Sequence, residues 1–177
     1  MVVHSQVMDH FVLHNLFHPN HHCSLPGHDT TTALLQVQAR LLDSAEKKMI
    51  NGSLFIDQSS AFDLVDHEIL LAKLTEYSFS PATLRWFRSY LSDRYCVYQV
   101  ESKRSTAMPL GPYGVPQGSI LGSLLFVVIQ NDLPAASPPS EQGQSVAYVD
   151  DDTEQAAHKD PDALEQDLQQ RADNVVA

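Results

Sequence analysis

Three consecutive carboxylates, Asp150 to Asp152, follow a short apolar run that ends in Tyr148. The pattern predicts a β-strand that runs into a tight turn, with the acids at its tip. Adjacent like charges repel one another unless a cation lies among them. Hard divalent cations such as Mg²⁺ take carboxylate oxygens as ligands. A solvated acidic turn is the plainer interpretation of such a run, and a metal site needs a further carboxylate from elsewhere in the chain.

Asp57 is the candidate for that further carboxylate. It ends a second short apolar run, residues 53–57, which follows the turn residues Asn51-Gly52 and predicts a buried strand. A metal site at the acidic turn needs such a carboxylate from a second segment, because hard divalent cations take carboxylate oxygens as ligands. We therefore expect Asp57 and Asp150 to lie close together at adjacent strand ends, although they are far apart in the sequence.

A third stretch, residues 111–118, contains glycine, proline and glutamine and predicts a loop. Ser119 then opens a helix that is apolar over most of its surface, which indicates that this helix is buried. Gly118 has no Cβ and therefore permits a close approach of the backbone to a ligand. Taken singly, Gln117 is typical of a turn and Phe62 of a hydrophobic core.

The remaining pattern predicts further helices and one β-hairpin. The helices are expected to begin at Asp29 or Thr30, at Asp66, at Ser80-Pro81 and at Asp160-Pro161. The first of them is expected to end near Lys48 and to carry an apolar stripe of Leu34, Val37, Leu41 and Ala45. The hairpin is expected to pair residues 95–100 with residues 106–110 across a polar turn at 101–105.

Seven of the nine histidines lie within residues 1–28. Three of them are spaced four apart and would form a stripe on one helix: His10, His14 and His18. With Cys23 nearby, zinc binding is one interpretation of this stripe. A partly exposed helix is the alternative, packed through Val7, Phe11 and Phe17. We expect no structural metal here, because the stripe lacks a closed set of four ligands.

Composition bounds the class of protein. The 177 residues are 43% apolar, enough for one domain with a hydrophobic core. The net charge of −11, with only 11 Lys plus Arg, argues against general binding to nucleic acid. The two cysteines form no CxxC pair, which favours a reducing compartment. The longest apolar run, Ile120–Ile129, is too short to span a membrane, and the N-terminus lacks the basic start of a signal peptide. We therefore expect an intracellular protein with no membrane contact.

In their order and spacing, these stretches resemble the reverse transcriptases of non-LTR, LINE-like retrotransposons. The three palm motifs of that family resemble Phe55–His67, Gly114–Phe126 and Tyr148–Asp151. Smaller similarities lie at Pro26–His28, Ser89–Arg94 and Asn131–Pro134. The resemblance extends from about residue 10 onward, and it depends on the joint order of the motifs, because any one of them can occur by chance.

The resemblance implies an α+β fold. It would be a polymerase palm, an antiparallel sheet backed by helices, with part of the fingers in front. Residues 1–52 would be the partial fingers region, and residues 53–177 the partial palm with the three motifs. The implied activity is that of an RNA-directed DNA polymerase, with an RNA template, a DNA primer and deoxynucleoside triphosphates as partners. The implied cofactor is a pair of Mg²⁺ ions, with Mn²⁺ as an alternative.

The resemblance also implies roles for individual residues. Asp57 and Asp150 would bind both metal ions, and Asp151 would assist them as the third catalytic acid. Phe62 would stack under the sugar and reject a 2′-hydroxyl group. Gln117, Gly118 and Tyr148 would contact the incoming nucleotide and the template.

The sequence departs from the family pattern in three places. Leu25 occupies the position of a basic finger residue that holds the triphosphate in relatives. Residues 152–155 are polar where the family has an apolar strand, so we expect a weak return strand. The chain ends at Ala177, before the family's later palm motifs and thumb. The alternative is therefore a decayed or co-opted fragment that acts as an interaction module. We expect that this chain alone does not extend a primer.

Overall fold

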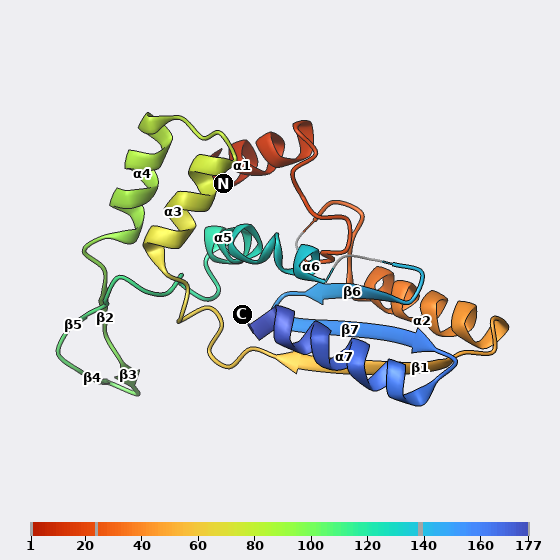
Figure 1. Ribbon diagram of the computed structural model, residues 1–177. Coiled ribbons are helices and arrows are strands. Elements are labelled where there is room, and N and C mark those ends of the chain that lie inside the picture. Colours follow the sequence, from red (N-terminus) through yellow and green to blue (C-terminus); the bar gives the residue numbers. More distant parts are fainter. Residues whose placement is uncertain (1, 24, 138–139, 177) are drawn as a thin grey trace. The chain divides into compact units, whose positions relative to one another are not determined.

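The structure is a computed structural model that describes residues 2–23, 25–137 and 140–176 (Figure 1). It combines helices with antiparallel strands, so the predicted α+β class is confirmed. The chain forms two compact units: unit 1 consists of residues 1–59 and 130–177, and unit 2 of residues 60–129. This division by compactness differs from the predicted division into fingers and palm after residue 52, which stays a prediction.

Unit 1 is built on a three-stranded antiparallel sheet. Its strands are β1 (Ile50–Asp57), β6 (Gly143–Tyr148) and β7 (Asp151–His158). Their order is β1-β7-β6, so β7 lies in the centre and is paired along its length with β1. The expectation of a weak return strand is therefore wrong. The polar residues of β7 are accommodated because neighbouring polar side chains bond to them, as described below.

β1 is an edge strand of this sheet and not the buried strand that the sequence predicts. It begins at Ile50, so Asn51-Gly52 lies inside the strand. Phe55 is 75% exposed, because β1 has only β7 as a neighbour among the described strands and its side chains are not covered on both faces. Asp57 lies at the C-terminal end of the strand, as predicted.

Helices α2 (Thr30–Glu46) and α7 (Pro161–Val176) cover opposite faces of the sheet (Figure 1). Side chains alternate between the two faces of a strand, and β7 shows this alternation. Glu154 and His158 contact α7. Gln155 instead bonds to Gln144, whose amide reaches the α2 backbone. The unit also contains α1 (Val2–Leu13) and α6 (Leu133–Ala136).

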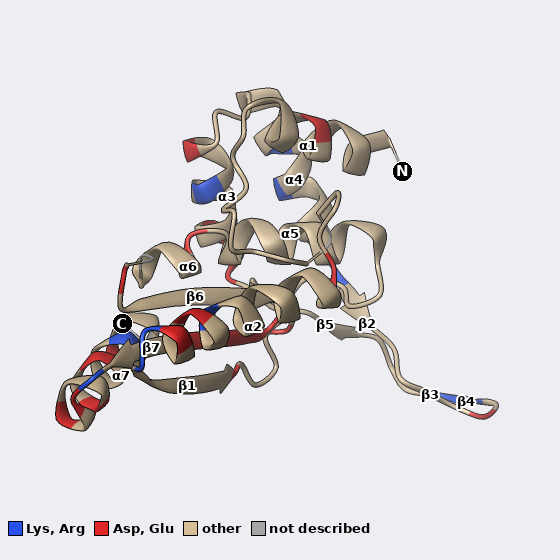
Figure 2. Ribbon diagram, turned by 90° about the vertical axis from the view of Figure 1, so that its right-hand side faces the viewer, with Lys and Arg blue, Asp and Glu red and all other residues tan. Residues whose placement is uncertain are grey.

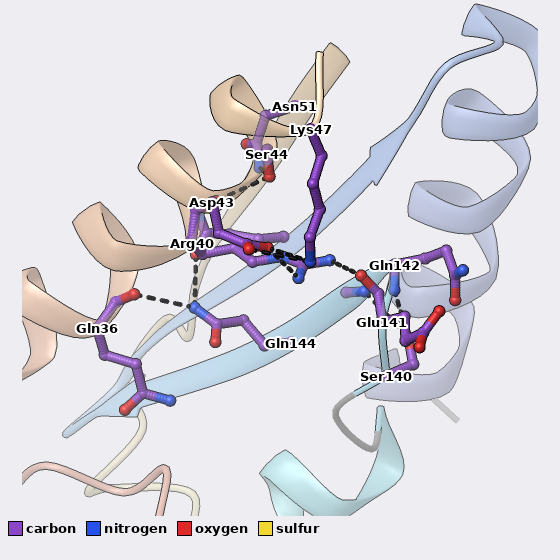
Figure 3. A network of polar contacts seen from close by, with 12 residues as sticks. Gln36, Arg40, Asp43, Ser44, Lys47, Asn51, Ser140, Glu141, Gln142 and Gln144 are labelled. Carbon is purple, nitrogen blue, oxygen red and sulfur yellow. Dashed lines mark hydrogen bonds and ion pairs between the residues drawn. The ribbon is translucent and has the colours of Figure 1, made fainter. Parts of the chain in front are cut away.

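Polar bonds fasten α2 to the sheet and to the segment before β6 (Figure 3). The amide of Gln144 donates to the carbonyl of Gln36 at 3.2 Å, and Arg40 Nη2 donates to the carbonyl of Glu141 at 2.6 Å. The predicted leucine stripe is wrong: Leu34 and Leu41 are exposed, whereas Ala33 and Ser44 are buried. Hydrogen bonds from Gln144 and Arg40 therefore make part of the contact between the helix and its neighbours, a contribution that the apolar stripe does not predict.

α1 ends at Leu13, so the predicted histidine stripe does not continue to His18 along one helix. The rings of His10 and His14 still lie near each other, with centroids 4.5 Å apart. Val7 and Phe11 are buried, as predicted for a packed helix. None of the helices in the described part of the chain is both long enough and apolar enough to cross a membrane.

Unit 2 consists of three helices and a two-stranded ribbon. The helices are α3 (His67–Glu76), α4 (Pro81–Leu91) and α5 (Ile120–Gln130), whose last residue belongs to unit 1. Asp66 and Ser80 cap α3 and α4 through side-chain bonds to backbone N–H groups, as predicted. The ribbon contains β2 (Tyr95–Cys96), β3 (Gln99–Val100), β4 (Lys103–Arg104) and β5 (Met108–Pro109). β2 pairs with β5, as the predicted hairpin requires. β3 pairs with β4, so residues 103–104 belong to a strand and the turn is shorter than the predicted 101–105.

Candidate active site

The pairing of β1 with β7 brings the three predicted acids to one end of the sheet. Asp57 is the register partner of Asp151. The backbone N–H of Gln58 donates to the carbonyl of Asp150 at 3.3 Å, just beyond the end of β1. The backbones of three acids from two separate segments therefore lie near one another, as the expected proximity of Asp57 and Asp150 requires. The role of these acids as metal ligands stays a prediction.

The turn between β6 and β7 fixes the position of Asp150. Tyr148 pairs with Asp151, which leaves Val149 and Asp150 as the turn. Val149 has a φ of 56°, in the left-handed region. For a β-branched residue this conformation is strained, at about 1–3 kcal/mol. The strand pairs on both sides hold it, so the turn presents Asp150 in one defined conformation.

The three consecutive acids have three different environments. Asp150 is half-buried in the turn, and Asp151 is exposed on the face of the sheet that α2 covers. Asp152 points to the other face and is buried, where the Ser145 hydroxyl donates to it at 3.1 Å. Burial raises the pKa of Asp152 above its usual range. The acidic run thus supplies two carboxylates to the site and one to the interior.

A cavity of about 460 Å³ lies beside the acids, between α2 and the sheet. Asp57, Asp151 and Tyr148 are among its lining residues. Apolar side chains form much of the rest: Leu34, Val37, Phe55 and Val146. The predicted contact residue Tyr148 therefore shares a cavity with two of the predicted metal-binding acids.

These acids fit a divalent cation that a substrate helps to hold. No Lys or Arg in the described part of the chain forms an ion pair with Asp57, Asp150 or Asp151. Within the same residues, no three His, Cys, Asp or Glu side chains form a ready metal cage. Mg²⁺ is usually bound through one or two carboxylates, with water and substrate phosphates completing its shell. A pair of free carboxylates at a cavity rim meets that requirement.

Phe62, Gln117 and Gly118 belong to unit 2. The ring of Phe62 stacks on Phe126 of α5, with centroids 4.5 Å apart and planes 19° from parallel. The carbonyl of Phe62 accepts a hydrogen bond from Val115 N–H at 2.8 Å. Phe62 remains half-exposed, so one part of its ring is packed and another is available for contact.

The loop of residues 114–118 is held by bonds to the segment that follows Phe62. Gly114 N–H donates to the carbonyl of Val65 at 2.8 Å, and the His67 side chain donates to the carbonyl of Gly114 at 2.8 Å. Gly114 has a φ of 89°, and a Cβ there would lie 3.1 Å from the Asp63 carbonyl oxygen. Glycine is therefore required at this position.

Gln117 and Gly118 lie at an exposed turn. Ser119 N–H donates to the carbonyl of Pro116 at 3.1 Å and closes the turn, and Gly118 has a φ of 78°. No atom lies within 4 Å of a Cβ built at Gly118. The turn therefore leaves the Gln117 amide and the Gly118 backbone open to a ligand.

Sequence reasoning missed Arg171, which fastens α7 to the strand that carries Asp151. Arg171 Nη1 lies 3.1 Å from Glu154 Oε2, and its Nε lies 2.8 Å from Asp167 Oδ1. His158 Nε2 lies 2.7 Å from the other oxygen of Asp167. The only available signal was a single arginine in an acidic helix, four residues after an aspartate.

Glu154 is fully buried in this network. Burial raises its pKa from the usual 4.5 to about 7, the negative charge of Asp152 adds to the rise, and Arg171 opposes it. Ser145, between the two acids on β6, also bonds to the carboxylates. The network therefore has a function in positioning β7 and is not exposed to a substrate.

Leu25 is buried. The position at which the resemblance leads us to expect a basic residue therefore carries a core residue in this chain.

Comparison with known proteins agrees with the motifs. The family model for reverse transcriptase (RNA-dependent DNA polymerase) matches residues 2–173. The chain is 34% identical over 108 residues to the probable RNA-directed DNA polymerase from transposon BS of Drosophila melanogaster, covering 61% of this chain and 12% of that protein. It is 33% identical over 128 residues to the RNA-directed DNA polymerase from mobile element jockey of the same species, covering 70% of this chain and 14% of that protein. The chain therefore spans only about an eighth of the length of these relatives.

Solved structures show the same fold. The apo telomerase from Candida tropicalis aligns with a TM-score of 0.69 at 12% sequence identity, covering 95% of this chain and 33% of that one. A form of that telomerase truncated from its C-terminal domain aligns with a TM-score of 0.67, also at 12% identity, over 99% of this chain and 36% of that one.

Proposed function

Since the chain belongs to the reverse transcriptase (RNA-dependent DNA polymerase) family, we propose that it carries the nucleotidyl-transfer site of an RNA-directed DNA polymerase. The observation that carries this proposal is the register of β1 on β7, which sets Asp57 opposite Asp151 with Asp150 in the adjoining turn. The ligands proposed for the site are two Mg²⁺ ions, or Mn²⁺, together with a deoxynucleoside triphosphate, an RNA template and a DNA primer.

Each acid has a distinct task in this proposal. Asp57 and Asp150 provide the oxygens that bind both ions, and Asp151 assists from the start of β7. When bound, the ions lower the pKa of the primer 3′-hydroxyl and neutralise charge on the leaving pyrophosphate. The strained turn at Val149 and the strand pairing hold the backbone of Asp150 and Asp151 beside that of Asp57.

The residues of unit 2 are proposed to act on the nucleotide and the template. The half-exposed ring of Phe62, fixed by its stack on Phe126, is suited to reject a 2′-hydroxyl group by contact. The open turn at Gln117 and Gly118 lets a base or sugar approach the backbone closely. The alternative of a fragment that acts only as an interaction module has less support, because both the acid-bearing hairpin and this loop keep defined geometry.

Titration calorimetry with Mn²⁺ tests the metal-binding part of the proposal. We expect the wild-type chain to bind Mn²⁺ weakly and Asp57→Asn/Asp150→Asn to lose that binding. Asp160→Asn/Asp162→Asn is the matched control, because it removes the same charge beyond the opposite end of β7. Equal binding by the wild type and by Asp57→Asn/Asp150→Asn would refute the site.

Extension of a DNA primer on an RNA template tests activity separately. Our expectation is that the chain alone shows none, because Leu25 and the net charge of −11 weaken its hold on the triphosphate and the duplex. Extension by the wild type that is lost in Asp150→Asn would overturn this expectation while supporting the assignment of the acids.

A further inference from the structure

The ribbon of unit 2 carries aromatic rings that the protein does not cover. Besides the strand pairs, Leu110 N–H donates to the carbonyl of Arg94 at 2.8 Å, and Ser105 N–H donates to the carbonyl of Tyr98 at 2.9 Å. The ribbon therefore extends from Arg94 to Leu110 as two short ladders, β2–β5 and β3–β4, joined through residues 97–98 and 105–107. Tyr95 and Tyr98 on its first strand are 65% and 63% exposed. Their rings have no packing function that would account for them.

These tyrosines line a groove within unit 2, with a volume of about 540 Å³. We call it the tyrosine groove. The lining residues on which the inference rests are Tyr90, Tyr95, Tyr98, Tyr113, Arg94 and Gln117. Four of the chain's six tyrosines therefore gather around one groove. Gln117 also lines the groove, so the groove is continuous with the turn that is proposed to contact the nucleotide.

A ladder of planar groups leads from α4 into the groove. The rings of Trp86 and Tyr90 are stacked, with centroids 5.5 Å apart and planes 8° from parallel. The Arg94 guanidinium lies over the ring of Tyr90, 5.4 Å from its centroid. Trp86 is 42% exposed. Stacked rings and a guanidinium present flat surfaces on which nucleic-acid bases stack.

The charge around the groove favours a polyanion, unlike the charge of the whole chain. Five basic residues fall within residues 85–104: Arg85, Arg88, Arg94, Lys103 and Arg104. Only two acids, Asp93 and Glu101, accompany them. No carboxylate in the described part of the chain pairs with Arg94, Lys103 or Arg104. Figure 2 shows the basic strand β4 at the far end of the ribbon.

The groove itself is close to neutral, because Asp63 lines it as well as Arg94. A ligand held there by charge alone is therefore excluded. A single-stranded polynucleotide combines the two features that the surface provides for, planar bases for the rings and phosphates for the cations beside them.

We propose that the tyrosine groove binds single-stranded nucleic acid, and that its ligand in the polymerase is the unpaired template strand leading to Gln117. The bases stack on Tyr95, Tyr98 and Tyr113, and Arg94 with the basic strand β4 contacts the backbone. The identity of the strand as template rests on the proposed function, whereas the binding of single strands does not.

Fluorescence anisotropy with a short labelled RNA lacking secondary structure tests the proposal. The assay contains EDTA and no primer or triphosphate, so that it does not depend on the metal site. We expect Tyr95→Ala/Tyr98→Ala to weaken binding by roughly five- to a hundredfold for each base that loses its stack. Tyr95→Phe/Tyr98→Phe keeps the rings and should retain binding. Equal affinity of the alanine variant and the wild type would overturn the proposal.

Two further experiments separate the contribution of base stacking from that of charge. Arg94→Ala should lower the slope of log affinity against log salt by about 0.7, the value for one lost phosphate contact. Lys159→Ala, an exposed cation of unit 1, is its matched control and should leave the slope unchanged. Duplex DNA should bind more weakly than the single strand, because its bases are already stacked. Equal binding of duplex and single strand would contradict recognition through the rings.

The result also separates this inference from the proposed function. Asp57→Asn/Asp150→Asn should bind the RNA like the wild type. If the chain binds no Mn²⁺ but binds the RNA as expected, the tyrosine groove is supported and the nucleotidyl-transfer site is refuted. If the chain binds Mn²⁺ but not the RNA, only the proposal for the tyrosine groove is refuted. A protein segment is then the next ligand to test.

Discussion

The two units of the molecule differ most in their charge. Unit 2 contains six Lys plus Arg and six Asp plus Glu, which leaves five basic and sixteen acidic residues for unit 1. The whole net charge of −11 therefore lies in unit 1, which also holds the three candidate metal-binding acids (Figure 2). The net charge of the whole chain argues against binding to nucleic acid. This argument does not apply to unit 2, which carries the tyrosine groove and has no net charge.

The units also use polar and aromatic side chains differently. Unit 1 buries charge, because Glu154 and Arg171 lie inside between β7 and α7. Unit 2 leaves rings such as Tyr95 and Tyr98 exposed. A buried charge stabilises one arrangement of strands only while its partner is present, whereas an exposed ring is available to a ligand.

Removal of Arg171 should have the largest effect on stability. Arg171→Ala leaves Glu154 buried without its cation, a change that costs about 3–5 kcal/mol. Hydrogen exchange should show the loss in the amides of β1, β6 and β7, while α3 and α4 of unit 2 keep more of their protection. Unchanged protection of β7 would show that the buried pair does not hold the sheet, and Lys159→Ala serves as a control of equal charge.

The stability of unit 1 should fall as the pH rises through the range in which Glu154 titrates. The pKa of Glu154 is about 7 in the folded chain against its usual 4.5. Below pH 4.5 the group is protonated in both states, so its favourable contribution is complete; the contribution is lost as the pH rises to about 7. The change amounts to about 3 kcal/mol over that range.

A comparison of variants isolates this contribution from that of His21. Burial lowers the pKa of His21 to about 4, so its contribution has the opposite sign and is lost as the pH falls below 6.5 toward 4. Urea denaturation at pH 5 and pH 7 should therefore show a decline in stability for the wild type that is absent in Glu154→Gln, where the opposite contribution of His21 remains. An identical decline in both proteins would exclude Glu154 as the source.

A smaller loss should follow from a change in the loop of unit 2. Gly114→Ala places a side chain at a φ of 89° and within 3.1 Å of the Asp63 carbonyl oxygen. We expect a loss of about 1–2 kcal/mol. Trp86 fluorescence is a suitable probe, because this single tryptophan lies in unit 2. Gly111→Ala should be close to neutral, since its Cβ would lie 4.0 Å from Cδ2 of Tyr113. Equal losses in both variants would argue against a special conformation at Gly114.

Much of the fold follows from local sequence signals. The caps at Asp29, Asp66 and Ser80 place three helices, because each supplies a side-chain oxygen to backbone N–H groups that lack partners. The acidic turn is predicted because an apolar strand runs into charged residues. The proximity of Asp57 and Asp150 is predicted because a shared metal site requires it, and local propensity does not reveal it. In the structure it arises from pairing between distant segments, in which Asp57 is the register partner of Asp151, next to Asp150.

Two of the failed predictions share one physical cause. The sequence predicts an apolar stripe on α2 that contains Leu34 and Leu41, and the polar residues of β7 predict a weak strand. In the structure Gln144 and Arg40 bond across to their partners, so polar groups lie at the interface and Leu34 is exposed. Hydrophobic periodicity cannot reveal such bonds, because each depends on a partner far away in the sequence. The role of Arg171 was hidden for the same reason.

The central claim is that Asp57, Asp150 and Asp151 bind divalent cations at the end of the β1–β7 pair. Its most direct test is the loss of amide NMR signal when Mn²⁺ is added in small amounts to the ¹⁵N-labelled chain. The account predicts that signals of residues 57–58 and 148–152 broaden first, and that Asp57→Asn/Asp150→Asn abolishes this broadening. Broadening that begins instead at the acids of α7, or that persists unchanged in the double variant, would contradict it.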